Sequence, residues 1–230
     1  MWSGTRGIAH DIGVRGPVAC IDGSHIVDAG SDRDMLCHRL PLRALEQVRS
    51  VLVEAEAATV IFASDVIYHD ARSEPFLPFL TVWSDRVEAV QSVWDDANWG
   101  GEHAIAAAVA IAPRDRIERA VGRLAAELGD DVQTISFGVR DGTWGMVVRV
   151  AGISKGTALR WIAEHYGIAP SETVAVGDWI NDVPLLAAAG RSFCMAQAPP
   201  EVIASASEQL NANGWDGGGI AEAAARSGML

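Results

Sequence analysis

The chain has 230 residues, 49% of them hydrophobic and 21% charged, which allows one large domain or two small ones and argues against disorder. Its formal net charge of -12 argues against a nucleic-acid partner, because a phosphate backbone attracts clustered Lys and Arg. The three scattered cysteines give no disulfide framework, and no segment has the length of a membrane span or the pattern of a signal peptide. We therefore expect a soluble, cytoplasmic protein without a membrane partner.

The first 150 residues have the pattern of an α+β layer. A short buried strand ends at the turn Asp22-Gly23, and amphipathic helical spacing alternates with β-branched runs further on. The expected elements are a strand over 18–21, a helix over 40–55, paired strands over 59–63 and 66–68, a strand over 106–111, a helix over 114–128, and strands over 132–137 and 145–150 around Asp141-Gly142.

The pattern changes after Gly152 to an alternation of helix and strand. We expect a helix over 155–166, a strand over 173–176, a helix over 183–189 and a strand over 193–196. Such alternation predicts a parallel sheet with crossover helices. The change of pattern places a boundary near Val150.

The densest chemical signal follows the strand that ends at Gly177. Asp178, Asn181 and Asp182 come directly after it. Ligands of parallel sheets lie beyond the carboxyl ends of the strands, and two carboxylates with an amide suit Mg²⁺, which takes oxygen ligands. The alternative interpretation is a helix N-terminus with acidic residues that favour the helix dipole.

A lysine lies at the start of the preceding helix. Lys155 follows Gly152-Ile153-Ser154, and a cation at a helix N-terminus opposes the dipole, so it needs an anionic partner. A phosphate group or an aspartyl-phosphate is one such partner. The alternative is an ordinary exposed lysine.

Together these two segments resemble the last two motifs of the haloacid dehalogenase superfamily, and the Cof-type phosphatase branch fits best. Ile-Ser-Lys-Gly opens a helix, and Gly-Asp-x-x-Asn-Asp ends a short strand. Residues 196–202 resemble that branch's Gly-Asn-Ala-Pro-Glu-Glu-Val loop, with Gln197 in place of Asn, and Asp216-Gly217 resembles its closing Asp-Gly. The resemblance extends from Ser154 to about Gly218.

The resemblance implies a role for each matched residue. Lys155 would neutralise the nucleophile and the phosphoryl group, and Asp178 would be the magnesium ligand. Asn181 and Asp182 would order the metal's surroundings and Lys155, so that Lys155 and Asp182 form the catalytic pair. Trp179 departs from the small or polar residue that is usual beside the metal ligand, so the pocket entrance is expected to differ.

The first motif of the family, Asp-x-Asp-Gly-Thr, does not occur in the sequence. In one alignment Cys20 takes the nucleophile's position, Asp22 is the acid-base residue and Ser64 binds phosphate. In the alignment that fits better, residues 16–28 resemble the Pro-x-Ile-x-x-Asn-Gly-Ala-x-Ile-x-Asp segment, which makes Asp22 and Gly23 candidate substrate residues. The chain would then begin at the second motif, with Ser3-Gly4-Thr5-Arg6 near the family's Thr-Gly-Arg. Either the sequence is a shortened form, or another segment or subunit fills the gap.

Two further patterns carry competing interpretations. Cys37 and Arg43 have the Cys-x5-Arg spacing of cysteine phosphatases, but the intervening residues are bulky and include Pro41. Trp83, Trp94 and Trp99 are candidates for sugar stacking, although packing in a core or an interface is the favoured role.

These observations predict an α/β fold. A Rossmann-like core, incomplete at its N-terminal strands, would comprise residues 1–38 and 149–230, with an α+β cap over residues 39–148. The function implied by the resemblance is a Mg²⁺-dependent phosphatase for a small phosphorylated metabolite such as a sugar phosphate. The alternative is a non-catalytic relative that binds phosphate or metal and lacks the nucleophile. A homo-oligomer, or a partner segment that completes the core sheet, is also expected.

Overall fold

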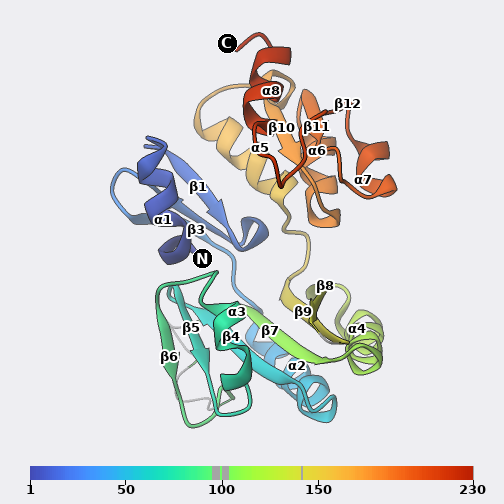
Figure 1. Ribbon diagram of the computed structural model, residues 1–230. Helices are drawn as coiled ribbons and strands as arrows, with labels where there is room; N and C mark the ends of the chain where they lie inside the picture. The colour runs from blue at the N-terminus through green and yellow to red at the C-terminus, as the bar shows by residue number, and fades with distance from the viewer. Residues whose placement is uncertain (95–98, 100–103, 141, 230) are drawn as a thin grey trace. The chain divides into compact units, whose positions relative to one another are not determined.

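The computed structural model describes residues 1–94, 99, 104–140 and 142–229 (Figure 1). Contacts divide the chain into two compact units, residues 1–152 and 153–230. Each unit has its own hydrophobic clusters. The predicted grouping of residues 1–38 with 149–230 concerns how the two units meet, and it stays a prediction.

The first unit begins with a helix and a small antiparallel sheet. Helix α1 (Trp2–Asp11) precedes β1 (Pro17–Cys20), the short 3-10 helix η1 (Ile21–Gly23), β2 (His25–Asp28) and β3 (Arg33–Cys37). The three strands pair in the order β1-β2-β3, each antiparallel to the next. Trp2 and Ala9 of α1 are buried against Val27 of β2, which fixes the helix on this sheet.

A six-stranded sheet forms the rest of this unit. Its strands run in the order β6-β5-β4-β7-β9-β8, and all neighbours are antiparallel except β5 and β6. The elements are α2 (Leu42–Glu54), β4 (Ala58–Ala63), β5 (Val66–His69), η2 (Glu74–Phe76), α3 (Leu77–Leu80), β6 (Val87–Ala89), β7 (Ile105–Pro113), α4 (Arg114–Leu128), β8 (Val132–Arg140) and β9 (Thr143–Val150).

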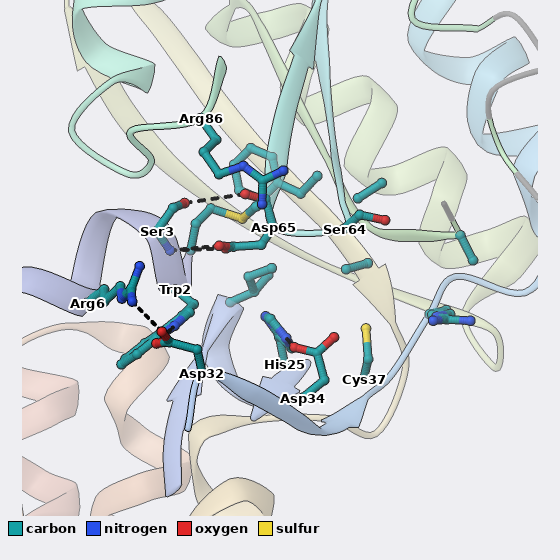
Figure 2. Close-up of a pocket in the computed structure, with 17 residues that line it drawn as sticks. Trp2, Ser3, Arg6, His25, Asp32, Asp34, Cys37, Ser64, Asp65 and Arg86 are labelled. Carbon is teal, nitrogen blue, oxygen red and sulfur yellow. Dashed lines mark hydrogen bonds and ion pairs between the residues drawn. The ribbon is translucent and has the colours of Figure 1, made fainter. Parts of the chain in front are cut away.

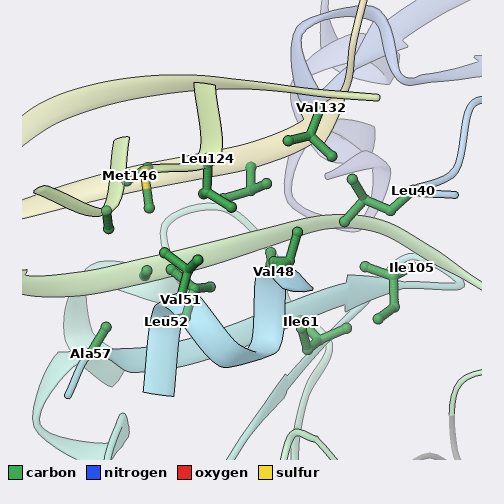
Figure 3. Packing of buried hydrophobic residues seen from close by; sticks show 14 of the residues in the cluster. Leu40, Val48, Val51, Leu52, Ala57, Ile61, Ile105, Leu124, Val132 and Met146 are labelled. Carbon is green, nitrogen blue, oxygen red and sulfur yellow. The ribbon is translucent and has the colours of Figure 1, made fainter. Parts of the chain in front are cut away.

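Side chains alternate between the two faces of a sheet, and the central strands β4 and β7 are buried on both faces. Ile61 of β4 belongs to the same buried cluster as Val48 and Leu52 of α2 and Leu124 of α4 (Figure 3). Val60 and Phe62, which alternate with Ile61 along β4, belong to a second buried cluster. The members of this cluster are Met1, Val60, Phe62, Ile67, Leu80, Ala107 and Val109.

The second unit is a three-layered α/β sandwich. Strands β10 (Val174–Gly177), β11 (Arg191–Cys194) and β12 (Glu208–Gln209) are parallel, in that order. Leu186 and Val202 pack on one face of the sheet, and Leu210 and Ala223 pack on the other. The remaining elements are α5 (Lys155–His165), η5 (Pro170–Glu172), η6 (Ile180–Asp182), α6 (Val183–Ala188), α7 (Pro200–Ser205) and α8 (Gly219–Arg226).

The structure confirms the predicted α/β class and the elements that carry strong periodicity. Helix α4 has the predicted bounds, and the parallel sheet with crossover helices follows Gly152 as expected. Sequence reasoning missed the helices α1, α3, α7 and α8 and the strands β2, β3, β6 and β12. Asp141 of the predicted turn lies outside the described residues. Within the described part of the chain, no helix has both the length and the apolarity for crossing a bilayer.

Candidate active site

A buried carboxylate organises the turn that follows β10. Asp182 ends η6 and is 5% exposed. Its Oδ2 accepts hydrogen bonds from the backbone nitrogens of Asp178 (2.9 Å) and Trp179 (3.1 Å). Because these nitrogens directly follow the strand, the Asp182 side chain locks the backbone that carries Asp178 at the carboxyl end of β10.

The other oxygen of this carboxylate holds the predicted lysine. Lys155 Nζ donates to Asp182 Oδ1 at 2.5 Å. The lysine is the first residue of α5, whose N-cap Ser154 exchanges hydrogen bonds with Thr157. The anionic partner required by a cation at a helix start is therefore Asp182. One carboxylate joins the ammonium of Lys155 to the backbone of Asp178, so the two predicted motifs meet.

Two glycines allow this approach. A Cβ atom at Gly177 would lie 2.5 Å from Cβ of Asp182, and one at Gly156 would lie 2.2 Å from the carbonyl oxygen of Pro184. Real Cβ contacts are not this short, so any side chain at either position would displace its neighbour. The glycines in both motifs thus bring the start of α5 and the start of α6 together around Asp182.

The predicted metal ligand Asp178 is exposed at the end of β10. Gln197 Nε2 donates to Asp178 Oδ2 at 3.4 Å, and Gln197 Oε1 accepts from the Gly214 nitrogen at 2.9 Å. Gln197 therefore connects Asp178 to the two loops that follow β11 and β12. Asn181 lies half-buried in η6, one residue before Asp182.

The donor set of this unit supplies few metal ligands. Among the described residues, no group of three or more His, Cys, Asp or Glu side chains could hold a metal ion. Asp182 already accepts three hydrogen bonds, which leaves the carboxylate of Asp178 as the accessible anionic ligand. Mg²⁺ commonly binds through one or two carboxylates together with water and substrate phosphate. Asp178 fits one position of such a site.

A compositional signal for this site was present in the sequence and was missed. Lys155 is the only lysine of the chain, whereas the other seventeen basic residues are arginines. A lysine presents a compact point charge and an arginine a broad planar fork, so the two are not equivalent. In a chain that otherwise uses arginine throughout, the single ammonium lies at the junction of the two motifs.

The two candidate substrate residues lie in the first unit. Asp22 has a left-handed backbone, with φ of 50°. Its Oδ2 accepts from Arg149 Nη1 at 2.9 Å, and the same nitrogen donates to the Asp22 carbonyl at 3.2 Å. Arg149 on β9 is almost completely buried, and burial lowers the pKa of its guanidinium while Asp22 opposes that shift. Asp22 and Gly23 therefore form a turn that a buried arginine anchors to the six-stranded sheet.

The cysteine alternatives do not find support in the geometry. Cys20 is buried at the end of an antiparallel strand, and burial raises the pKa of its thiol. Burial also raises the pKa of Cys37, and Arg43 forms an ion pair with Asp131. A raised pKa keeps a thiol protonated, and the thiolate is the nucleophilic form.

The tryptophans of the first unit act in packing. Trp83 meets Phe79 and Phe62 edge to face. Trp99 is 7% exposed and donates its indole N–H to the carbonyl oxygen of Val93. Trp94 is half-buried against the same cluster. Packing therefore accounts for Trp83 and Trp99, and the packing role of Trp94 stays a prediction.

Comparison with known proteins identifies the family. A family model described as haloacid dehalogenase-like hydrolase matches residues 1–223. The chain belongs to this family.

Solved structures support the same fold. A haloacid dehalogenase-like hydrolase from Bacteroides thetaiotaomicron has a TM-score of 0.79 at 18% identity, over 98% of this chain and 82% of that one. A sugar phosphatase of the HAD subclass IIB has a TM-score of 0.76 at 17% identity, over 97% of this chain and 80% of that one. The predicted Rossmann-like haloacid dehalogenase fold with a cap is thereby confirmed as a fold.

Curated relatives match over shorter segments. A phosphoglycolate phosphatase of Halorubrum lacusprofundi is 34% identical over 116 residues, which are 49% of this chain. The matched segment spans 48% of that relative's length, so the chain covers about half of it.

Proposed function

We propose that the protein is a phosphoric monoester hydrolase of the haloacid dehalogenase type that acts on a small phosphorylated metabolite. The observation that carries the proposal is the carboxylate of Asp182, which holds the only lysine and the backbone of Asp178 on its two oxygens. The relatives described above include a phosphoglycolate phosphatase and a sugar phosphatase, and this supports the substrate class.

The chemistry follows from the charges. Hydrolysis breaks the ester P–O bond, water supplies the hydroxyl that joins phosphorus, and the leaving alkoxide takes the proton. The ammonium of Lys155 is held in place by Asp182 and stabilises the negative charge on the phosphoryl oxygens. Asp178 would hold a magnesium ion, which when bound neutralises further phosphate charge.

The alternative function is a phosphate- or metal-binding relative without turnover. Such a relative would keep the Lys155 and Asp178 site and bind an anion or a metal ion there without breaking an ester bond. The raised pKa of Cys20, which argues against a thiolate nucleophile at that position, favours this alternative.

Turnover of p-nitrophenyl phosphate by the full chain separates the two functions. A phosphatase hydrolyses it in the presence of Mg²⁺, and loses activity with chelator or on Asp178→Asn. Glu164→Gln, a matched loss of charge on the exposed side of α5, leaves activity unchanged. If no ester is turned over and yet phosphate with Mg²⁺ raises the melting temperature, the binding function holds. Turnover that ignores both chelator and Asp178→Asn contradicts the assignment of this site.

We also propose a cytoplasmic location and an assembly that completes the sheet of the second unit. The three free cysteines favour a reducing compartment. Strand β10 has a neighbour on one side only among the described strands. The net charge of -12 argues against nucleic acid as the partner, and the ammonium of Lys155 supports a small phosphorylated metabolite.

A further inference from the structure

Two of the eight tryptophans are exposed, and both lie beside the candidate active site. Trp179 is 48% exposed and Trp215 is 89% exposed. The hydrogen bonds of Gln197 run from Asp178 to Gly214, and each tryptophan is the next residue along the chain from one end of that bridge. Two exposed indole side chains therefore start from backbone positions close to the predicted metal ligand.

The other six tryptophans are covered by their neighbours. Trp2 is buried beside Asp32 and donates its indole N–H to that carboxylate at 3.0 Å (Figure 2). Trp161 stacks on a histidine of its own helix, and the guanidinium of an arginine lies over the ring of Trp144. The remaining three, Trp83, Trp94 and Trp99, are buried or half-buried in the first unit. An exposed tryptophan is therefore the exception in this chain, and the exception occurs next to the site.

The backbone at both exposed positions is held by a polar side chain. The nitrogen of Trp179 donates to Asp182 Oδ2 at 3.1 Å. The nitrogen of Trp215 donates to Asn213 Oδ1 at 2.8 Å, and the same oxygen accepts from the Asp216 nitrogen at 2.9 Å. An aromatic side chain on a fixed backbone has only two side-chain torsions to order, so a ligand that contacts it loses little binding energy to entropy.

The chemistry of the indole ring indicates what such a ligand would be. A large exposed apolar side chain gains free energy when another apolar group covers it. The flat π face of an indole favours another flat ring, because stacked aromatic rings gain more than the area that they bury accounts for. Since Lys155 would hold the phosphoryl group, the organic part of an ester would lie within reach of side chains that begin beside Asp178.

We propose that this site selects phosphate esters whose organic part carries a flat aromatic or heteroaromatic ring, and that Trp179 and Trp215 contact that ring. The inference rests on the proposed function and deepens it, because it names the class of ester that the same site takes. The contact is particular to this chain, since the resemblance implies a small or polar residue at position 179.

Two phosphonates test the ring contact in the full chain with Mg²⁺. Methylphosphonate and phenylphosphonate carry the same anionic head, and only the second carries a ring. Neither has an ester bond, so binding is measured whether or not the protein turns over an ester. The readout is the ε-methylene signal of Lys155, the only lysine, in protein labelled with ¹³C-lysine. We expect both compounds to shift this signal and phenylphosphonate to bind about tenfold more tightly.

Tryptophan variants decide whether the two indoles cause this preference. Trp179→Ala combined with Trp215→Ala should reduce the preference to about twofold or less and leave methylphosphonate binding unchanged. Trp179→Phe combined with Trp215→Phe should keep most of the preference, because a ring remains at each position. Trp161→Ala, which removes a stacked indole of α5, is the matched control and should change neither dissociation constant.

The outcomes separate this inference from the function on which it rests. If neither phosphonate shifts the Lys155 signal at about 10 mM, the proposed site is wrong and the inference falls with it. If the two phosphonates bind equally well, or if the double alanine variant keeps the preference, only the ring contact is overturned. Loss of methylphosphonate binding in that variant would also contradict the inference, because the tryptophans would then shape the turn at Asp178 instead of holding a ring.

Discussion

At the residue scale, Asp182 shows how one side chain can hold a site together. It accepts hydrogen bonds from Lys155, from the backbone of Asp178 and from the backbone of Trp179. Because the carboxylate is buried, each of these bonds is shielded from water and positions its donor. The hydrogen bond to Asp182 therefore fixes the position of the Lys155 ammonium group in the site.

Lys155→Arg tests whether the site needs a compact ammonium. The guanidinium is larger and planar, so it should keep the ion pair with Asp182 in a different geometry and misplace the charge that faces phosphate. We expect kcat/KM for an aryl phosphate to fall by about 100-fold, with the fold preserved. Arg160→Lys, the reverse change on the same helix, is the control and should leave kcat/KM unchanged. Full activity in Lys155→Arg would show that any cation suffices.

Asp22→Ala tests the buried ion pair of the first unit. It would leave the almost fully buried guanidinium of Arg149 without its carboxylate, since Asp22 is the charged partner at 2.9 Å. Removal of one partner of a buried pair costs about 3–5 kcal/mol, so the urea midpoint should drop sharply. Glu118→Ala, which removes an exposed pair with Arg114, should cost at most about 1 kcal/mol. Equal midpoints for the two variants would argue that Arg149 is solvated.

At the element scale, close packing of α5 against the start of α6 positions the two motifs. Gly156 faces the carbonyl oxygen of Pro184, whereas the glycine in the middle of α4, Gly122, faces open space. A glycine is therefore required by close packing in α5, whereas in α4 a side chain would fit at the glycine position. Helix propensity alone would favour alanine at both positions.

Gly156→Ala and Gly122→Ala form a matched pair. Alanine at 156 would bring its Cβ within 2.2 Å of the Pro184 oxygen, so we expect a loss of about 1–3 kcal/mol and lower activity. Alanine at 122 meets nothing within 4 Å and should raise the stability by about 0.5–1 kcal/mol. Thermal unfolding of both variants checks the signs. A stabilising Gly156→Ala would mean that α5 and α6 are further apart.

The docking of α8 should make the second unit sensitive to acid. Hydrogen bonds from the backbone nitrogens of Ala212 and Asn211, with help from Arg226, lower the pKa of Glu222 below its ordinary value of 4.5. A lowered folded-state pKa gives stability that is present above about pH 4.5 and lost as pH falls through the folded pKa. Glu222→Gln should therefore flatten the melting temperature between about pH 5.5 and pH 3. An unchanged pH profile would contradict this role, and Glu164→Gln controls for the substitution.

At the scale of the whole molecule, the sequence predicts the elements that have a clear apolar pattern. Helix α4 was predicted from apolar residues at helical spacing, and strands β4 and β7 were predicted from short continuous apolar runs. Helix α1 was missed because it contains Gly4 and Gly7, and packing of Trp2 and Ala9 holds it instead. Helix α8 likewise begins in a run of glycines.

The candidate site likewise contains residues that the sequence predicted and one contact that it did not. Lys155, Asp178 and Asp182 were predicted from two short motifs, and the structure brings Lys155 and the backbone of Asp178 onto one carboxylate. Arg149 was not predicted as the partner of Asp22, because 127 residues separate the two positions in the chain.

The most direct test of the whole account uses the single lysine. Protein labelled with ¹³C- and ¹⁵N-lysine carries one labelled side chain, that of Lys155. We expect inorganic phosphate with Mg²⁺ to shift its ε-methylene and ammonium signals, and Asp178→Asn to weaken that response by about tenfold. If the signals of the folded protein do not move at saturating phosphate and Mg²⁺, Lys155 does not face the anion and the proposed site is wrong.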